Sequence, residues 1–151
     1  MDFYLDRLLD LPDTTVETCT FEGQDIYLKL RLVSEGGYCP DCENYSDALH
    51  QKRPILVRDL SIFGKHSHLH VTRRQYYCST CQSHFTEALS WMGEQRRYTQ
   101  RYENYIYRRV QHSSIEEVSR EEGLSWDQVS GVVKRRCQAT IRAKKTKIDA
   151  I

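Results

Sequence analysis

Two Cys-x-x-Cys pairs constrain this 151-residue chain more than any other feature. Cys39 and Cys42 form the first pair, Cys78 and Cys81 form the second, and 35 residues separate the two. Each pair predicts a tight turn that presents two thiolates to one side, and two such turns complete a tetrahedral site for one zinc ion. Because protein sulfurs would fill all four positions, we expect a structural Zn²⁺ and a zinc-ribbon fold around it.

Disulfide bonding and redox chemistry are the alternative uses of these cysteines. Disulfides need an oxidising compartment, and residues 1–4 begin with an acidic residue instead of the basic segment of an export signal. A redox dithiol at Cys39 and Cys42 lacks the strand–helix context of a thioredoxin-like fold. Cys19 and Cys137 have no partner at ligand spacing, so we expect a small core residue and a buried or semi-exposed free thiol, respectively.

Histidines near the cysteines offer a second set of potential metal ligands. His66, His68 and His70 alternate along a predicted strand and therefore share one face. We interpret this face as exposed and polar, because the cysteines already complete a zinc shell. His50 and His84 are the substitutes if one of the four cysteines is not a ligand.

Charge is distributed unevenly along the chain, although the formal net charge is only +1. Residues 1–38 carry three Lys/Arg and eight Asp/Glu, whereas residues 91–151 carry 13 and eight. This asymmetry favours a polyanionic partner for the C-terminal part. No apolar run approaches the roughly 18 residues that a membrane span needs, so we expect a soluble, cytoplasmic protein with no membrane partner.

Strand patterns dominate the first part of the chain, after a short helix predicted over residues 3–10. Alternating apolar and polar side chains predict half-buried strands. The strands are expected to pair through turns at glycines: 16–21 with 26–33 around Gly23, and 54–59 with 66–77 around Gly64. Residues 1–90 are therefore predicted to form a small domain of a β-hairpin and a four-cysteine zinc ribbon.

Helical periodicity replaces the strand pattern in residues 91–151. Over residues 96–111, apolar and tyrosine side chains recur every three or four positions, which predicts an amphipathic helix with a tyrosine-rich inner face. Its arginines are expected to be mostly solvated. Arg97 and Arg101 are candidates for phosphate contacts near a helix end, and Arg96 lies beside them.

Residues 115–134 predict a helix-turn-helix. The small Ser119 allows close approach of the second helix, and Gly123 suits a left-handed turn between the helices. Valine and leucine side chains fill the space between the two helices: Val118, Leu124, Val129 and Val132. Ser125 and Gln128 have the spacing of a capping box, so the second helix is predicted to run from about Trp126 to Cys137.

The outward positions of this second helix favour contact with DNA. The candidates are Ser125, Trp126, Gln128, Ser130, Lys134 and Arg135. Gln128 can pair with adenine or phosphate, and the two basic residues can reach phosphates or guanine. Trp126 packs either on another helix or against a sugar. Basic residues follow as an expected flexible arm, with Arg142, Lys144 and Lys145 as further candidates.

A role in protein interaction is the alternative to DNA binding. A helical hairpin of this type can pack on a protein, in which case the helix-turn-helix would be scaffold. The chain would then be a zinc-ribbon adaptor or a transcriptional regulator. Weak, salt-insensitive DNA binding would support the adaptor.

The combination of motifs resembles the N-terminal part of bacterial insertion-sequence transposases of the ISL3 family. The segments that carry the resemblance are Cys39–Cys42, Arg58–Leu60, Arg73–Cys81, Phe85–Glu87 and Ser125–Val129. Many family members have glycine after the second cysteine of the first pair, where this chain has Glu43. The resemblance covers about residues 8–147.

The resemblance implies an α+β protein that recognises double-stranded DNA at the terminal inverted repeats of a mobile element. Family transposases continue into a catalytic domain of the RNase H type, in which three carboxylates hold two metal ions. This chain stops at Ile151, so we expect it to bind DNA in the bacterial nucleoid without cutting it. It could regulate or inhibit transposition, alone, as a dimer, or with full-length transposase.

Overall fold

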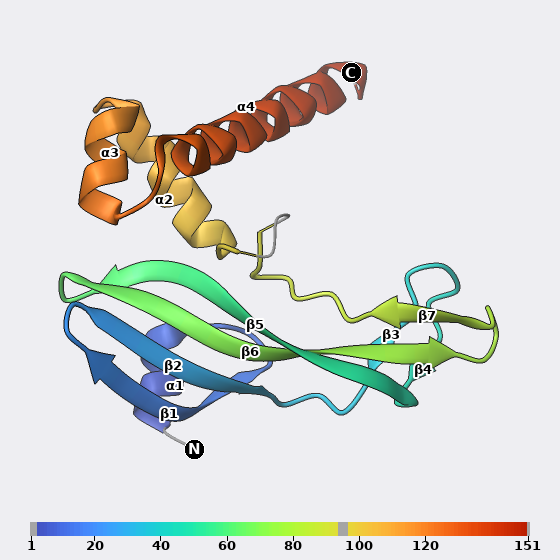
Figure 1. Cartoon of the computed structure of the whole chain (residues 1–151). Helices are drawn as coiled ribbons and strands as arrows, with labels where there is room; N and C mark the ends of the chain where they lie inside the picture. Colours follow the sequence, from blue (N-terminus) through green and yellow to red (C-terminus); the bar gives the residue numbers. More distant parts are fainter. Residues whose placement is uncertain (1–2, 94–96, 151) are drawn as a thin grey trace. The chain divides into compact units, whose positions relative to one another are not determined.

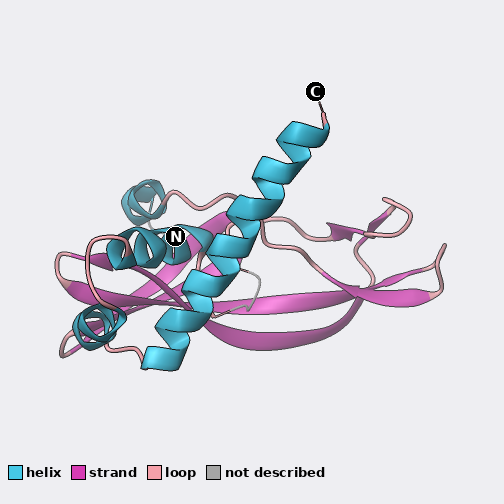
Figure 2. Ribbon diagram, turned by 90° about the horizontal axis from the view of Figure 1, so that it is seen from above, coloured by secondary structure: helices cyan, strands magenta, loops and turns pink. Residues whose placement is uncertain are grey.

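The computed structural model describes residues 3–93 and 97–150 of the chain. It contains two compact units, residues 1–99 and residues 100–151. The first unit is a sheet with one short helix, and the second consists of helices, so the predicted α+β class is confirmed (Figures 1 and 2). Residues 91–99 belong to the sheet unit, whereas the sequence placed the domain boundary at residue 90.

A five-stranded mixed sheet forms the first unit, with strand order β1-β2-β6-β5 and β7 paired with β6. Its strands are β1 (Thr14–Glu22), β2 (Asp25–Leu32), β5 (Leu49–Ile62), β6 (Lys65–Cys78) and β7 (Ser83–Thr86). Only the β2–β6 pair is parallel; the others in this sheet are antiparallel. A two-stranded sheet of β3 (Gly37–Tyr38) and β4 (Tyr45–Ser46) lies between β2 and β5 in the chain.

Both predicted hairpins are confirmed, and the second is longer than expected. Gly23 and Gly64 adopt left-handed conformations at the two turns, with φ of 58° and 77°, which glycine accepts without strain. β5 includes the polar segment 49–53 that lacked an apolar pattern. As β5 is the edge strand of the sheet, it also tolerates Pro54, which cannot donate a ladder hydrogen bond.

The core of the sheet unit lies on one face of β2, β5 and β6. The alternating leucines of β2 are buried as predicted, with Leu28 and Leu30 each 3% exposed. Cys19 packs partly buried at the edge of this core, as expected for a small core residue. Helix α1 (Phe3–Leu9) is held on β1 by Asp6, whose carboxylate accepts hydrogen bonds from the Val16 amide at 2.6 Å and from a threonine hydroxyl.

Three helices form the second unit: α2 (Gln100–Val110), α3 (Ile115–Glu122) and α4 (Trp126–Asp149). α2 begins at Gln100, later than predicted, because the preceding residues are extended along β5. The Arg58 amide donates to the Arg97 carbonyl at 2.7 Å, and the Thr99 amide donates to the Arg58 carbonyl at 3.0 Å. Arg96 lies outside the described residues.

α4 is much longer than predicted. It continues past Cys137 to Asp149, so the expected flexible basic arm is wrong. Residues 138–149 contain no glycine or proline and are rich in Ala, Lys and Arg, which are good helix formers. Every residue from 137 to 150 is exposed, including the Cys137 thiol, which was expected to be at least partly covered. No helix among the described residues is long and apolar enough to cross a membrane.

Candidate zinc centre and nucleic-acid interface

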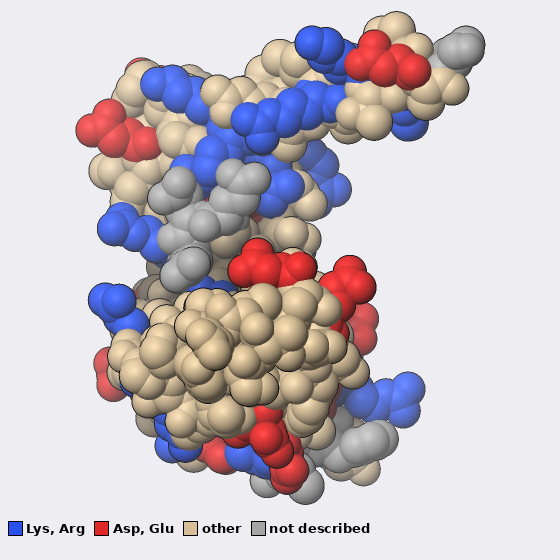
Figure 3. Space-filling view, turned by 90° about the vertical axis from the view of Figure 1, so that its right-hand side faces the viewer, with Lys and Arg blue, Asp and Glu red and all other residues tan. Residues whose placement is uncertain are grey.

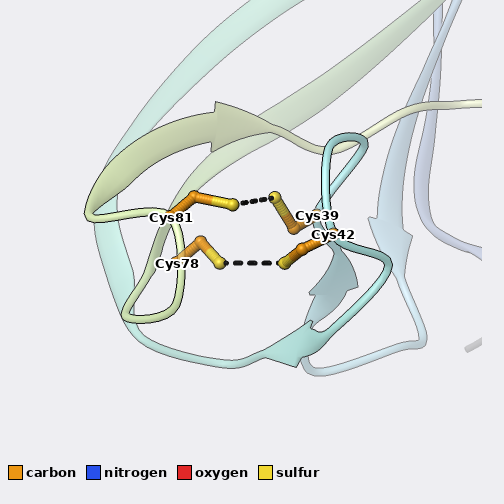
Figure 4. Close-up of side chains that lie close together, drawn as sticks. All are labelled: Cys39, Cys42, Cys78 and Cys81. Atoms are coloured by element: carbon orange, nitrogen blue, oxygen red, sulfur yellow. Dashed lines mark hydrogen bonds between the residues drawn. The ribbon is translucent and has the colours of Figure 1, made fainter.

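The four paired cysteines converge at the end of the sheet unit (Figure 4). The Sγ atoms of Cys39 and Cys81 are 3.9 Å apart, those of Cys42 and Cys78 are 3.5 Å apart, and all four lie within 4.8 Å of one another. Zn–S bonds of ~2.3 Å in a tetrahedron place sulfurs ~3.8 Å apart. The geometry therefore fits one zinc ion with four thiolate ligands, and the predicted structural zinc is confirmed.

Each Cys-x-x-Cys pair lies in a tight turn of the same kind. Cys78 ends β6 and Cys81 precedes β7, while Cys39 follows β3. The residue after the second cysteine adopts a left-handed conformation in both turns, with φ of 61° at Glu43 and 54° at Gln82. This backbone requirement gives a physical reason why glycine suits the position that Glu43 occupies.

The thiols of the second pair titrate very differently. Hydrogen bonding by the Cys81 backbone N–H lowers the pKa of Cys78 to about 7. A hydrogen bond with the Cys42 thiol is the largest cause, and burial the next, that raise the pKa of Cys81 to about 12. Four adjacent sulfurs cannot all be negative without a cation among them, so bound zinc stabilises the fully deprotonated set.

The histidines do not join the zinc centre. His50 and His84 pack against each other with tilted rings, whose centroids are 3.8 Å apart. His66 and His68 pair instead with charged neighbours: an Arg58 nitrogen lies 2.7 Å from the first, and an Asp25 oxygen lies 2.8 Å from the second. Within residues 3–93 and 97–150, the four cysteines are the one group of three or more candidate ligands that could hold a metal ion.

The helix-turn-helix has the predicted internal packing. Val118, Val129 and Val132 are fully buried. Gly123 caps α3 in a left-handed conformation with φ of 65°, and its amide donates to the Ser119 carbonyl. These residues therefore perform the structural roles that the sequence assigned to them.

A capping box starts α4, as predicted. The Gln128 amide donates to Ser125 Oγ at 3.1 Å, and the Ser125 amide donates to Gln128 Oε1 at 2.8 Å. This reciprocal pair fixes both side chains at the first turn of α4. Gln128 Oε1 keeps a second lone pair, and the amide NH₂ group of the side chain remains a donor.

A buried carboxylate that the sequence analysis missed joins α2 to α4. Glu103 has a side chain that is only 3% exposed, and its two oxygens accept from Arg135 and Arg136, each at 2.9 Å. A second link joins α2 to α3, since the Tyr102 hydroxyl donates to the Glu122 carboxylate at 2.9 Å. Arg135 is therefore an internal ion-pair partner as well as a candidate for DNA contact.

The other candidates for DNA contact divide by exposure. Ser130 is only 7% exposed, so its predicted outward position is wrong: α4 packs on both α2 and α3, and its buried face is wide. Arg101 is half-buried, and Arg97 belongs to the sheet unit. The remaining candidates are exposed: Ser125, Trp126, Gln128, Lys134, Arg142, Lys144 and Lys145. Basic side chains gather along α4 in Figure 3.

A four-cysteine zinc ribbon followed by a helix-turn-helix defines a class of DNA-binding protein regions. Two family models match in this order. Residues 35–81 match the zinc-finger of transposase IS204/IS1001/IS1096/IS1165, and residues 87–143 match the helix-turn-helix domain of transposase family ISL3. The chain belongs to the ISL3 transposase family and corresponds to its N-terminal, DNA-binding region.

One curated relative is a transposase for insertion sequence element IS1001 from Bordetella parapertussis. It is 30% identical over 120 residues, which cover 80% of this chain and 30% of the relative. The chain thus spans under a third of the length of that relative. No solved structure matches.

Proposed function

We propose that this chain is the sequence-specific DNA-binding module of an ISL3-family transposase and recognises the terminal inverted repeats of its element. The observation that carries the proposal is the start of α4. A fully packed helix-turn-helix leaves Trp126 and Lys134 exposed on α4, the position from which recognition helices enter the major groove. Binding, without cleavage, is the activity proposed for residues 1–151 in the bacterial nucleoid.

The capping box narrows the role proposed for Gln128. Bidentate pairing with adenine needs both the carbonyl and the amide of a glutamine side chain. Since the hydrogen bond from the Ser125 amide holds Gln128 Oε1 at the start of α4, the side chain acts through its amide NH₂ group, which donates to a phosphate or to an acceptor on a base edge. Lys134 is exposed and can reach a phosphate or guanine directly. The basic helix from Arg142 to Lys145 adds phosphate contacts that fix orientation but carry no sequence information.

Selection from a randomised duplex pool, on zinc-loaded protein at two salt concentrations, tests this proposal. We expect one enriched motif, and an affinity that falls steeply as salt rises. Lys134→Ala should weaken binding to the enriched duplex without changing the melting temperature, because its side chain is exposed. Absence of enrichment together with salt-independent binding would overturn the proposal.

Regulation of transposition is a further consequence that we propose for this module. A chain that occupies the inverted repeats, or forms mixed dimers with transposase, blocks assembly on the element ends. Adding the 151-residue chain to a transposition assay should lower the frequency of transposition. A variant that cannot bind DNA separates the two routes, since only mixed dimers would let it inhibit. Unchanged transposition with the wild-type chain would contradict this role.

A second candidate function is protein binding by the zinc end, which comprises residues 36–48 and 76–86. Its exposed aromatic side chains favour this function. Tyr38 is 73% exposed, Tyr45 is 54% exposed, and Tyr77 lies on the neighbouring β6. Large exposed aromatic side chains are typical of interaction sites. Replacing Tyr38 and Tyr45 with serine should leave DNA affinity unchanged and abolish association with a partner. Loss of DNA affinity instead would assign these tyrosines to the DNA interface.

A further inference from the structure

We propose that the sheet unit carries a second DNA-contact site, an arginine-lined hollow that binds backbone phosphates of the duplex recognised by the helix-turn-helix. The hollow has a volume of about 500 Å³ and lies along β5 and β6. Arginines from β5, from β6 and from the segment that follows β7 line it: Arg53, Arg73, Arg74 and Arg97. This inference rests on the proposed DNA-binding function.

The composition of the hollow favours an anion. Its lining includes four arginines and no aspartate or glutamate. Gln51, Gln75 and Thr86 add hydrogen-bonding groups, and a concave wall with charge of one sign concentrates the field at its mouth. Arginine is suited to phosphate, because its planar guanidinium donates two parallel hydrogen bonds to two oxygens.

The strand register places like charges directly opposite each other. Arg53 pairs with Arg73 and Lys52 pairs with Arg74 across the antiparallel β5–β6 ladder. Like charges in such positions destabilise a sheet. The Glu87 carboxylate already neutralises Arg74, and Lys52 does not line the hollow, so an anion bound there would act on the Arg53–Arg73 pair.

The arginines differ in how they are held. Arg74 forms several hydrogen bonds to the Glu87 carboxylate and donates to the Ser34 carbonyl at 2.7 Å, and Arg73 donates to the Glu87 carbonyl at 2.5 Å. These hydrogen bonds hold the guanidinium groups of Arg73 and Arg74 in place. Arg53 and Arg97 are exposed, and neither has an ion pair among the described residues. They are therefore the side chains that would move onto a phosphate.

The arginine-lined hollow and the zinc end also differ in surface charge. The outer face of the zinc end is largely uncharged in Figure 3, so electrostatic contact with DNA is not expected there. Arg97 is one residue from Tyr98, which bridges to Arg58 of β5, and this bridge ties the rim of the hollow to the sheet. The basic hollow thus provides the phosphate-binding chemistry of the first unit.

The test measures how DNA affinity depends on salt in the full zinc-loaded chain. For duplex DNA the slope of log K against log salt is about −0.9 for each phosphate contact. Arg53→Ala combined with Arg97→Ala should therefore make the slope shallower by about 1.8 and weaken binding of any sequence to a similar extent. The control is Lys29→Ala combined with Arg31→Ala, which removes two exposed charges beside Glu17 and should leave the slope unchanged.

Three outcomes would overturn the inference, and they are distinguishable. An unchanged slope in the Arg53/Arg97 variant, with wild-type binding intact, refutes the hollow and leaves the proposed function standing. No DNA binding by the wild-type chain refutes both. The third outcome is tested by calorimetric titration of the chain with inorganic phosphate alone. If the wild-type chain binds phosphate saturably, the Arg53/Arg97 variant does not, and the DNA salt slope of that variant equals the wild-type slope, the hollow binds a small free phosphate ligand instead of DNA. Zinc content and melting confirm that each variant is folded.

Discussion

Glu103→Gln should lower the free energy of unfolding of the helical unit by much more than the small change in side-chain shape implies. The Glu103 carboxylate is 3% exposed and neutralises two guanidinium groups, those of Arg135 and Arg136. Removing one partner of a buried ion pair costs about 3–5 kcal/mol. We expect about 3 kcal/mol here, because the two arginine side chains are 20% and 22% exposed and can turn partly to water.

That loss is large relative to the stability available to the unit. A domain with the 52 residues from Gln100 to Ile151 has a free energy of unfolding of about 3–8 kcal/mol. The assay is urea denaturation followed by circular dichroism at the helix band. This signal reports mainly on the second unit, whose helices have 11, 8 and 24 residues against 7 in α1.

Two further variants make the reasoning refutable. Glu116→Gln removes an exposed carboxylate of α3 and should change the free energy of unfolding by less than about 0.5 kcal/mol. Glu103→Leu combined with Arg135→Met and Arg136→Met removes the whole cluster and should recover most of the stability, since apolar replacement of a buried ion cluster is often neutral. If Glu103→Gln is as stable as Glu116→Gln, the cluster does not hold the helices together.

Three other changes test local features. Gly123→Ala should destabilise the helical unit by about 1–2 kcal/mol in urea denaturation, because alanine resists the φ of 65° there. Glu43→Gly should not speed the loss of zinc to a chelator, because residue 43 has a φ of 61°, which glycine accepts without strain; faster zinc loss would contradict this. Hydrogen bonds from Val16 and Thr15 lower the pKa of Asp6. Its contribution to stability is therefore complete above about pH 4 and lost as the pH falls through the folded pKa, so the stability difference between wild type and Asp6→Asn should shrink only below about pH 4.

The sequence predicted correctly those structures that are determined by residues close together in the chain. The helix-turn-helix follows from Gly123, the Ser125 capping box and the valine spacing, each of which acts within a few residues of its own position. The zinc site follows from ligand chemistry, because four cysteines in two knuckles have few other uses in one chain. The alternation in β2 likewise predicted which of its side chains are buried.

Features that depend on distant partners were not predictable in this way. The parallel pairing of β2 with β6 brings Ile26 beside Ser67, and no local pattern marks it. The partnership of Glu103 with Arg135 depends on how α2 packs against α4. The length of α4 is a different case: residues 138–149 lack any helix breaker, and their charge alone led to the expected flexible arm.

The two separate apolar clusters of the sheet unit predict how far the loss of zinc spreads. Cys39 and Cys78 pack with Tyr76 and Phe85 at the zinc end, while the main core around Leu28, Leu69 and their neighbours contains none of the four ligands. Cys78→Ser should therefore abolish zinc binding and unfold the zinc end, but leave the distal parts of β2, β5 and β6 folded.

Amide hydrogen exchange with and without chelator measures this division. Protection should disappear from residues 36–48 and 76–86 and persist in β2 and in the β6 segment around Leu69. The matched control, Cys137→Ser, changes an exposed thiol and should retain zinc and full protection. If chelation removes protection from the whole sheet, the main core cannot stand without the metal, and the zinc stabilises the entire unit instead of its end. Persistence of the main core would show that zinc organises only the end of the sheet.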